Sequence, residues 1–117
     1  MSRGPRVAED DVAAVAAALE MFPDGLNRRD LLDAVVRIAG RPVGDSAMRV
    51  AIEELRGRGE LIVHDGHKYR FAASYEQYAR WRVQSPLARA HRLLEQVRRM
   101  DDTASRKWPE QLQLIAA

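Results

Sequence analysis

Hydrophobic residues recur at helical spacing through the first half of the chain and indicate three short helices. The first is expected over residues 8–21, where apolar positions three and four apart form one stripe. The second is expected over 27–40, with Asn27 as its N-cap. The third is expected over 45–59, with Asp45 as its N-cap. Each of these helices has one face to bury, so together they can enclose a core.

The pattern then changes to two short runs that are typical of β-strands. Residues 61–64 and 68–71 are rich in apolar and aromatic side chains. Between them lies Asp65–Gly66, a pair that favours a type I′ turn because both central residues of that turn need a positive φ. We therefore expect a β-hairpin directly after the third helix.

Two more helices are expected after the hairpin. Ser74 and Gln77 form a capping box that opens the first of them. Its aromatic residues have the spacing of a packed helix face that joins the hairpin to the C-terminal helices: Tyr75, Tyr78 and Trp81. Ser85 and Pro86 resemble an N-cap and a first-turn proline, so we expect a kink or a new start there, and a last helix that extends to at least Met100.

The order and content of these elements resemble a known family. Residues 45–56, 59–62 and 69–70 resemble the recognition helix and wing of small bacterial and phage winged-helix DNA-binding proteins. In one phage and prophage subgroup the aromatic strand of the wing runs into a long Arg-rich helix, as it does over residues 69–78 here. The resemblance covers about residues 27–100. It implies a winged helix-turn-helix, mainly α with a small β-hairpin, and a role in regulating transcription or replication.

On this basis the sequence divides into four segments. Residues 1–7 are expected to be a flexible arm, and 8–73 the winged-helix domain. Residues 74–107 form a C-terminal helical extension and 108–117 a short tail. A chain of 117 residues is long enough for one ordinary domain but too short for two full cores.

The third helix and the hairpin carry the expected contacts to duplex DNA. In a helix-turn-helix the outward, N-terminal part of the recognition helix enters the major groove. The outward residues here are Ser46, Ala47, Arg49, Val50 and Glu53. Arg28 and Arg29, at the start of the second helix, are expected to meet phosphates, and Lys68 and Arg70 of the hairpin to contact the DNA backbone.

The last helix combines an apolar face with an arginine face. At about 100° per residue, the apolar residues fall on one arc, namely Leu87, Ala90, Leu93, Leu94, Val97 and Met100. A neighbouring arc holds further expected DNA contacts, namely Arg89, Arg92 and Arg99. Residues seven apart form a seam that predicts a homodimer: Leu87, Ala90, Leu94 and Val97. Packing of this seam on the first helix of the same chain is the alternative.

Two positions depart from the family pattern, and the acidic Glu53 and Glu54 together with the modest net charge favour a different function. Pro86 interrupts a helix that is usually continuous, and the acidic Glu53 lies beside Arg49 on the exposed face of the third helix. The formal net charge is only +2, whereas phosphate binding needs clustered basic residues. The alternative is a winged helix that binds another protein, either as a subunit of an assembly or as a phage inhibitor of a host nucleoprotein complex.

Residue content argues against catalysis and against a bound metal or cofactor. The chain has no cysteine, which excludes disulfides, thiolate catalysis and Cys-ligated zinc. It has no Gly-rich phosphate loop and no Ser–His–acid set, and His64 and His67 have no third ligand nearby in sequence. The acidic clusters at 9–11, 53–54 and 101–102 are interpreted as solvated surface. We expect no catalytic, metal or cofactor site.

The same content indicates where the protein resides. No apolar stretch approaches the roughly 18 residues that a membrane span needs. The N-terminus lacks the apolar segment of a secretory signal. We therefore expect a soluble, cytoplasmic protein of a bacterium or of a phage-infected cell, with duplex DNA as its partner and no membrane association.

Overall fold

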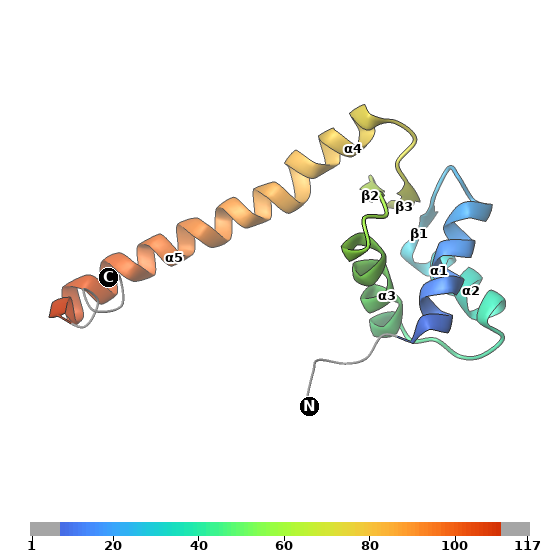
Figure 1. Cartoon of the computed structure of the whole chain (residues 1–117), viewed down its shortest axis with the longest axis horizontal. Helices are drawn as coiled ribbons and strands as arrows, with labels where there is room; N and C mark the ends of the chain where they lie inside the picture. The colour runs from blue at the N-terminus through green and yellow to red at the C-terminus, as the bar shows by residue number, and fades with distance from the viewer. Residues whose placement is uncertain (1–7, 111–117) are drawn as a thin grey trace. The chain divides into compact units, whose positions relative to one another are not determined.

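The protein is mainly helical and contains one small three-stranded antiparallel sheet, as Figure 1 shows. The structure is a computed structural model and describes residues 8–110. The predicted arm at 1–7 and residues 111–117 of the predicted tail lie outside the described residues. The chain forms two compact units, Met1–Trp81 and Arg82–Ala117, so the first unit includes most of the helix that follows the hairpin. The expected class, helices with a small β element, is confirmed.

Three helices build most of the first unit: α1 (Glu9–Met21), α2 (Arg28–Ala39) and α3 (Asp45–Gly57). Their bounds lie close to those that the apolar periodicity predicts. The side chain of Asn27 caps α2 by accepting a hydrogen bond from the backbone N–H of Asp30 at 2.8 Å. Gly40 ends α2 in the left-handed conformation that glycine adopts without strain.

The predicted cap of α3 is wrong. Gly44 is the N-cap residue, and among the described residues 8–110 no side chain forms a capping hydrogen bond to this helix. Asp45 is instead the first helical residue, and its carboxylate forms ion pairs with Arg28 and Arg49. The reason is that a carboxylate near a helix start can bind either its own backbone N–H groups or nearby cations, and here two arginines lie within reach.

The sheet consists of β1 (Leu26–Asn27), β2 (Ile62–Asp65) and β3 (Lys68–Phe71), with β3 in the centre. The predicted hairpin is therefore present, but its turn lies one residue later than expected. Asp65 pairs with Lys68 as the last residue of β2, so Gly66 and His67 are the central turn residues. Of these two only Gly66 has a positive φ, at +65°. That pattern fits a type II′ turn, which needs glycine only at its first central position, and not the predicted type I′ turn.

Strand β1 was not predicted from the sequence. It is only two residues long, and it pairs with β3 through Leu26 opposite Tyr69 and Asn27 opposite Lys68. Gly25 precedes it with φ +94°, and a Cβ atom at this position would lie 3.0 Å from the backbone oxygen of Tyr69. Only glycine fits this conformation and this close approach without strain.

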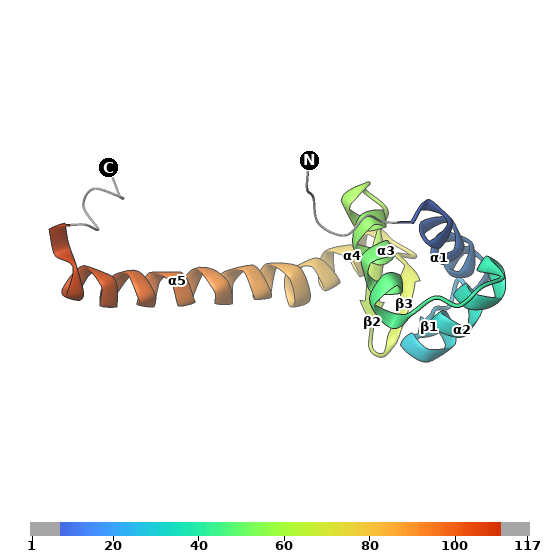
Figure 2. The same cartoon turned by 90° about the horizontal axis from the view of Figure 1, so that it is seen from below.

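The core of the first unit lies among α1, α2, α3 and the sheet, which surround it in Figures 1 and 2. Its largest fully buried side chains come from all of these elements: Val15 and Leu19, Leu31 and Val35, Met48, Ile62 and Val63. The inward face of α3 is the one that the sequence predicts: Met48, Ala51, Ile52 and Leu55. Its other face is therefore directed away from the core.

Helix α4 (Tyr75–Arg82) begins with the predicted capping interaction. The Ser74 Oγ accepts a hydrogen bond from the backbone N–H of Gln77 at 3.1 Å. The predicted packed aromatic face is only partly right, because no residue of α4 is fully buried and Tyr75 is 77% exposed. The ring of Trp81 does pack against α3, since the guanidinium group of Arg56 lies 4.7 Å from its centroid.

The second unit contains a π-helical turn, η1 (Val83–Leu87), and then α5 (Ala88–Lys107). Pro86 lies inside η1, so the predicted N-cap at Ser85 and the new helix start are wrong, while the alternative of a kink at this position stays a prediction. Proline has no N–H and its ring collides with the carbonyl four residues earlier. A wider π turn accommodates both effects without ending the helix. Among residues 8–110, no helix has the length and apolar character needed to cross a membrane.

Candidate functional site

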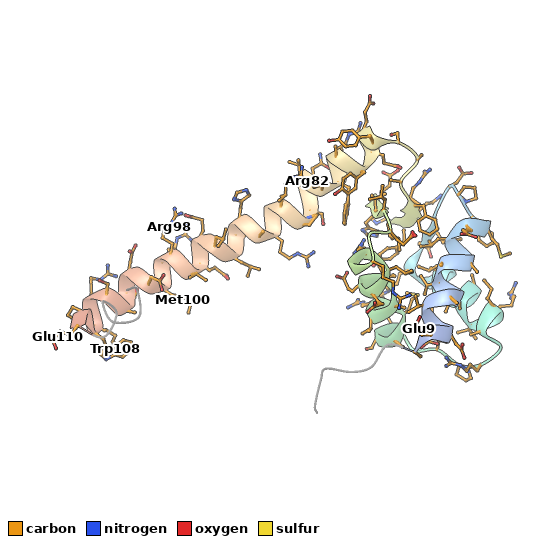
Figure 3. The ribbon with its side chains drawn as sticks, in the orientation of Figure 1. Glu9, Arg82, Arg98, Met100, Trp108 and Glu110 are labelled. Carbon is orange, nitrogen blue, oxygen red and sulfur yellow. The ribbon has the colours of Figure 1, made fainter. Side chains whose placement is uncertain are left out.

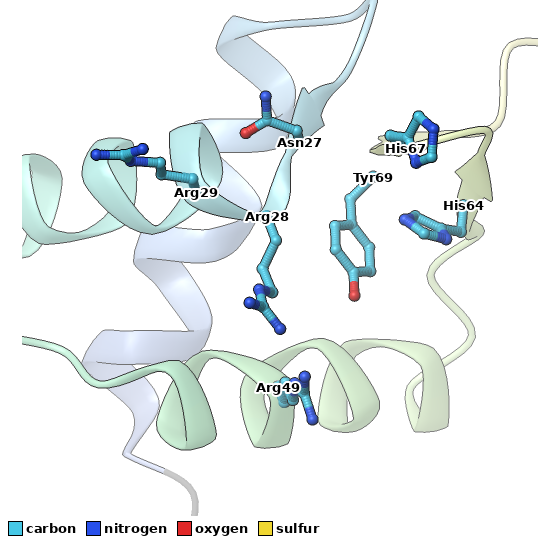
Figure 4. A pocket seen from close by; sticks show the side chains of 7 residues that line it. All are labelled: Asn27, Arg28, Arg29, Arg49, His64, His67 and Tyr69. Atoms are coloured by element: carbon cyan, nitrogen blue, oxygen red, sulfur yellow. The ribbon is translucent and has the colours of Figure 1, made fainter.

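An open hollow in the first unit is lined by several polar side chains that could bind an anion. It has a volume of about 460 Å³. We call it the cationic hollow and define it by the residues that line it: Asn27, Arg28, Arg29, Arg49, His64, His67 and Tyr69. Figure 4 shows that these side chains come from the start of α2, from α3 and from the hairpin.

The fold explains why these three parts of the chain meet. Strand β1 runs directly into α2, and its pairing with β3 holds Asn27 opposite Lys68. The start of α2 is thereby fixed beside the hairpin. Helix α3 is held in place by its buried face, with Met48 fully buried, and this leaves Arg49 on the exposed side.

Asp45 links two of the arginines in the hollow. Its Oδ1 lies 3.5 Å from the Nε of Arg28, and its Oδ2 lies 3.2 Å from the Nε of Arg49. The two arginine side chains are 59% and 58% exposed, so both remain accessible. In Figure 4 the side chain of Arg28 reaches toward α3, whereas Arg29 points away from Tyr69 and lies at the rim.

The hairpin side of the hollow carries aromatic rings. The rings of His64 and Tyr69 are tilted against each other with their centroids 4.5 Å apart. Burial lowers the pKa of His64, and the nearby charges of Arg56 and His67 lower it further. The hollow therefore combines three permanent cations with imidazole and phenol groups that can donate hydrogen bonds. This set of groups suits a phosphate or carboxylate ligand better than a cation or an apolar ligand.

The structure brings together only some of the residues predicted to contact DNA. Arg28, Arg29 and Arg49 line the hollow. On α3, Ser46, Val50 and Glu53 are exposed, whereas Ala47 is partly buried against the core. Glu53 forms an ion pair with Arg56 at 2.9 Å and not with its neighbour Arg49. The charge of Glu53 is thus offset by Arg56, which does not line the hollow.

The two predicted hairpin contacts differ from each other. Lys68 is exposed, while Arg70 is partly buried and its Nε lies 3.4 Å from the carbonyl oxygen of Phe71. Neither residue lines the hollow. Sequence reasoning missed Asn27, His64, His67 and Tyr69 as parts of a site. For the two histidines, the sequence did offer a signal, namely the polar character of the hairpin tip to which they belong.

One residue of the acidic clusters interpreted as solvated surface, Asp11, is instead buried, whereas its neighbours Glu9 and Asp10 are exposed as expected. Asp11 is buried and forms an ion pair with Arg41, which follows α2. Arg58 bonds to Glu9 of α1 and to Glu54 of α3. The hydrogen bonds that Arg58 donates to Glu9 and Glu54 raise the pKa of Arg58. Asp11 and Glu9 thus link α1 to the loop that follows α2 and to the end of α3.

The second unit presents the predicted arginine and apolar residues on α5, which has no buried residue. Arg89, Arg92 and Arg99 are exposed. Of the predicted seam, Leu87 is partly buried in η1, and the other members are exposed on α5: Ala90, Leu94 and Val97. Figure 3 shows Arg98 and Met100 leaving the helix on opposite sides. The apolar arc is thus open along most of the helix.

Comparisons with protein-family profiles, with curated protein sequences and with solved structures find no match to this chain.

Proposed function

We propose that this protein is a winged-helix protein that binds duplex DNA through the exposed face of α3 and the adjoining cationic hollow. The observation that carries the proposal is the position of Arg28, Arg29 and Arg49. The sequence predicts them separately, as phosphate and base contacts, and they line one open concavity beside the hairpin. A role in transcription or replication of phage type rests on the family resemblance of residues 27–100.

The proposed binding mode uses the two faces of α3. Its buried face keeps the helix fixed, and its exposed face begins with the small side chain of Ser46, which allows close approach to a groove. A major groove about 12 Å wide admits an α-helix. Arg49 would then reach the edge of a guanine or an adjacent phosphate, while Arg28 and Lys68 would contact the backbone on either side.

A salt titration tests this proposal. Binding to a random-sequence duplex, followed by fluorescence anisotropy, should weaken steeply between low and moderate salt because neutralised phosphates release counterions. Arg28→Ala and Arg49→Ala should each lower the affinity and reduce the logarithmic salt slope by about one. Arg37→Ala is the matched control, because Arg37 is an exposed α2 arginine outside the hollow.

Two results would contradict the proposal. One is the absence of binding at low salt, which would favour the alternative function of a protein-interaction module. The other is an equal loss of affinity in the Arg37→Ala and Arg49→Ala proteins, because binding would then depend on overall charge and not on the hollow.

We further propose that the DNA-binding form is a homodimer joined through α5. Four large apolar side chains of the second unit are each more than half exposed along this helix: Leu93, Leu94, Val97 and Met100. Helices with an exposed apolar stripe gain stability by burying it against a partner. A second copy of the chain supplies an identical stripe, which is how two-fold dimers form.

Sedimentation equilibrium tests the dimer. The wild-type chain should sediment as a dimer, and the double variant Leu94→Asp with Val97→Asp as a monomer. Gln96→Asp introduces a charge at an exposed position outside the predicted seam and should remain dimeric. A wild-type monomer at high concentration, or a dimer that survives the double substitution, would contradict this assignment.

A further inference from the structure

The geometry around Asp45 points to a second feature of the cationic hollow. We infer that the hollow holds one backbone phosphate of bound DNA, and that the carboxylate of Asp45 is paired with Arg28 and Arg49 until this phosphate displaces it. The inference rests on the proposed function, since it assumes that the ligand is DNA. It assigns to Asp45 the role of an internal competitor for the phosphate.

The ion pairs of Asp45 differ from the others in the protein. Among residues 8–110, every other ion pair is also a hydrogen bond, with an N–O separation of 2.9 Å or less. The contacts of Asp45 to Arg28 and Arg49 measure 3.5 and 3.2 Å, and neither is a hydrogen bond. Within the described part of the chain, neither of these two guanidinium groups donates a hydrogen bond. Their N–H groups are therefore still available to a ligand.

A phosphodiester group matches these available donors better than Asp45 does. A guanidinium group forms its strongest contacts as a fork, with two short bonds to the oxygens of one anion. Asp45 offers one oxygen to each arginine at a longer distance. A phosphate in the open hollow could approach both arginines and would also meet the hydroxyl group of Tyr69 and the ring of His64, which line the same space.

Asp45 would remain nearby after the exchange because it belongs to the first turn of α3, where the helix dipole favours a carboxylate. Its charge would then repel the phosphate that has taken its place. This repulsion lowers the affinity for any DNA backbone, whatever its sequence. Binding at a preferred site must therefore gain more from the contacts of α3 to the bases, which is a way to suppress non-specific complexes.

The test compares Asp45→Asn with the control Glu20→Gln, which also removes one negative charge. Glu20 is exposed and lies outside the hollow, and no described residue forms an ion pair with Glu20. Asp45→Asn should raise the affinity for a random-sequence duplex by about three- to tenfold at low salt, as expected for one charge near a phosphate at an exposed site. It should also steepen the logarithmic salt slope by about one. Glu20→Gln should change the affinity by less than about twofold.

A second measurement uses inorganic phosphate as the probe. Phosphate added to the full-length protein should shift the NMR signals of His64 and Tyr69, at lower concentration in Asp45→Asn than in the wild type. Thermal melting verifies that the variant folds, and Asp45→Ser provides a second variant that also lacks the carboxylate.

The outcomes separate the inference from the proposed function. If DNA binds but Asp45→Asn and Asp45→Ser have the affinity and salt slope of Glu20→Gln, the inference about Asp45 is overturned and DNA binding stands. If no duplex binds but phosphate shifts the signals of the hollow more readily in Asp45→Asn, the phosphate site stands and DNA as its ligand is rejected. If both variants bind DNA more tightly and phosphate shifts the same signals, both are supported.

Discussion

The ion pair between Asp11 and Arg41 allows a direct test of how a partly buried ion pair contributes to the stability of the first unit. Asp11 lies in the first turn of α1, and Arg41 lies in the loop between α2 and α3. The side chain of Asp11 is 8% exposed and that of Arg41 is 44% exposed. The contact therefore ties the loop that precedes α3, the proposed DNA-binding helix, to the start of α1.

The two partners differ in burial, and this difference sets the expected magnitudes. Exposed ion pairs contribute about 0–1 kcal/mol, whereas removing one partner of a fully buried pair costs about 3–5 kcal/mol. Arg41→Ala leaves the buried carboxylate of Asp11 without its cation, so we expect an intermediate loss of about 2 kcal/mol. Asp11→Ala leaves a guanidinium group that can turn to solvent, and should cost about 1 kcal/mol, part of it from the helix dipole.

The double variant distinguishes this explanation from one in which each substitution simply removes its own contacts and the losses of stability add. When Asp11 is also replaced by alanine, no unpaired carboxylate remains, so the Asp11→Ala, Arg41→Ala protein should be more stable than Arg41→Ala alone. Urea denaturation followed by circular dichroism measures all three free energies of unfolding. For a unit of this size, about 2 kcal/mol corresponds to a shift in Tm of roughly 8–16 °C. Additive losses, or a smaller loss for Arg41→Ala than for Asp11→Ala, would refute the argument.

Three further predictions concern other parts of the first unit. Gly25→Ala should lower the free energy of unfolding by roughly 2–3 kcal/mol because of the positive φ and the close approach to β3. Gly57→Ala, at a helical glycine with open space around it, is the control and should be neutral or stabilising. Equal chemical-denaturation midpoints for the two variants would contradict this prediction. Because the pKa of His64 is lowered in the folded protein, the unfolded chain binds more protons at this residue. The free energy of unfolding should therefore fall slightly as the pH drops below about 6.5 and through the folded pKa. Thermal melts of His64→Gln should lack this part of the pH dependence. Trp81→Ala should lower the free energy of unfolding by about 1 kcal/mol through loss of the contact with Arg56, and an unchanged denaturation curve would show that the contact contributes nothing.

The helices of the first unit could be predicted because their signals are local. Each has apolar residues at helical spacing, and α2 has both a capping side chain at Asn27 and a terminal glycine at Gly40. Strand β1 has no such signal, because two residues are too few to show a period. It forms only because Leu26 meets a partner more than 40 positions later in the sequence, Tyr69.

The candidate site was predictable in its residue types more than in its arrangement. Arg28 and Arg49 follow from the position of each at the start or on the outer face of a helix. That both contact the carboxylate of Asp45 depends on how α2 and α3 cross, which periodicity does not reveal. For the same reason Asp11 could be taken for a surface residue: its neighbours Glu9 and Asp10 are polar, and the burial comes from a loop distant in sequence.

The pairing of β1 with β3 also has a consequence for the motions of the protein. The hairpin cannot separate from the rest of the first unit without breaking the hydrogen bonds that fix Leu26 and Asn27 at the entrance to α2. Local opening of these two regions is therefore one event, with one opening free energy. A ligand that binds at Arg28 would lower the frequency of this event and slow deuterium uptake along β2 and β3, including amides that it never touches.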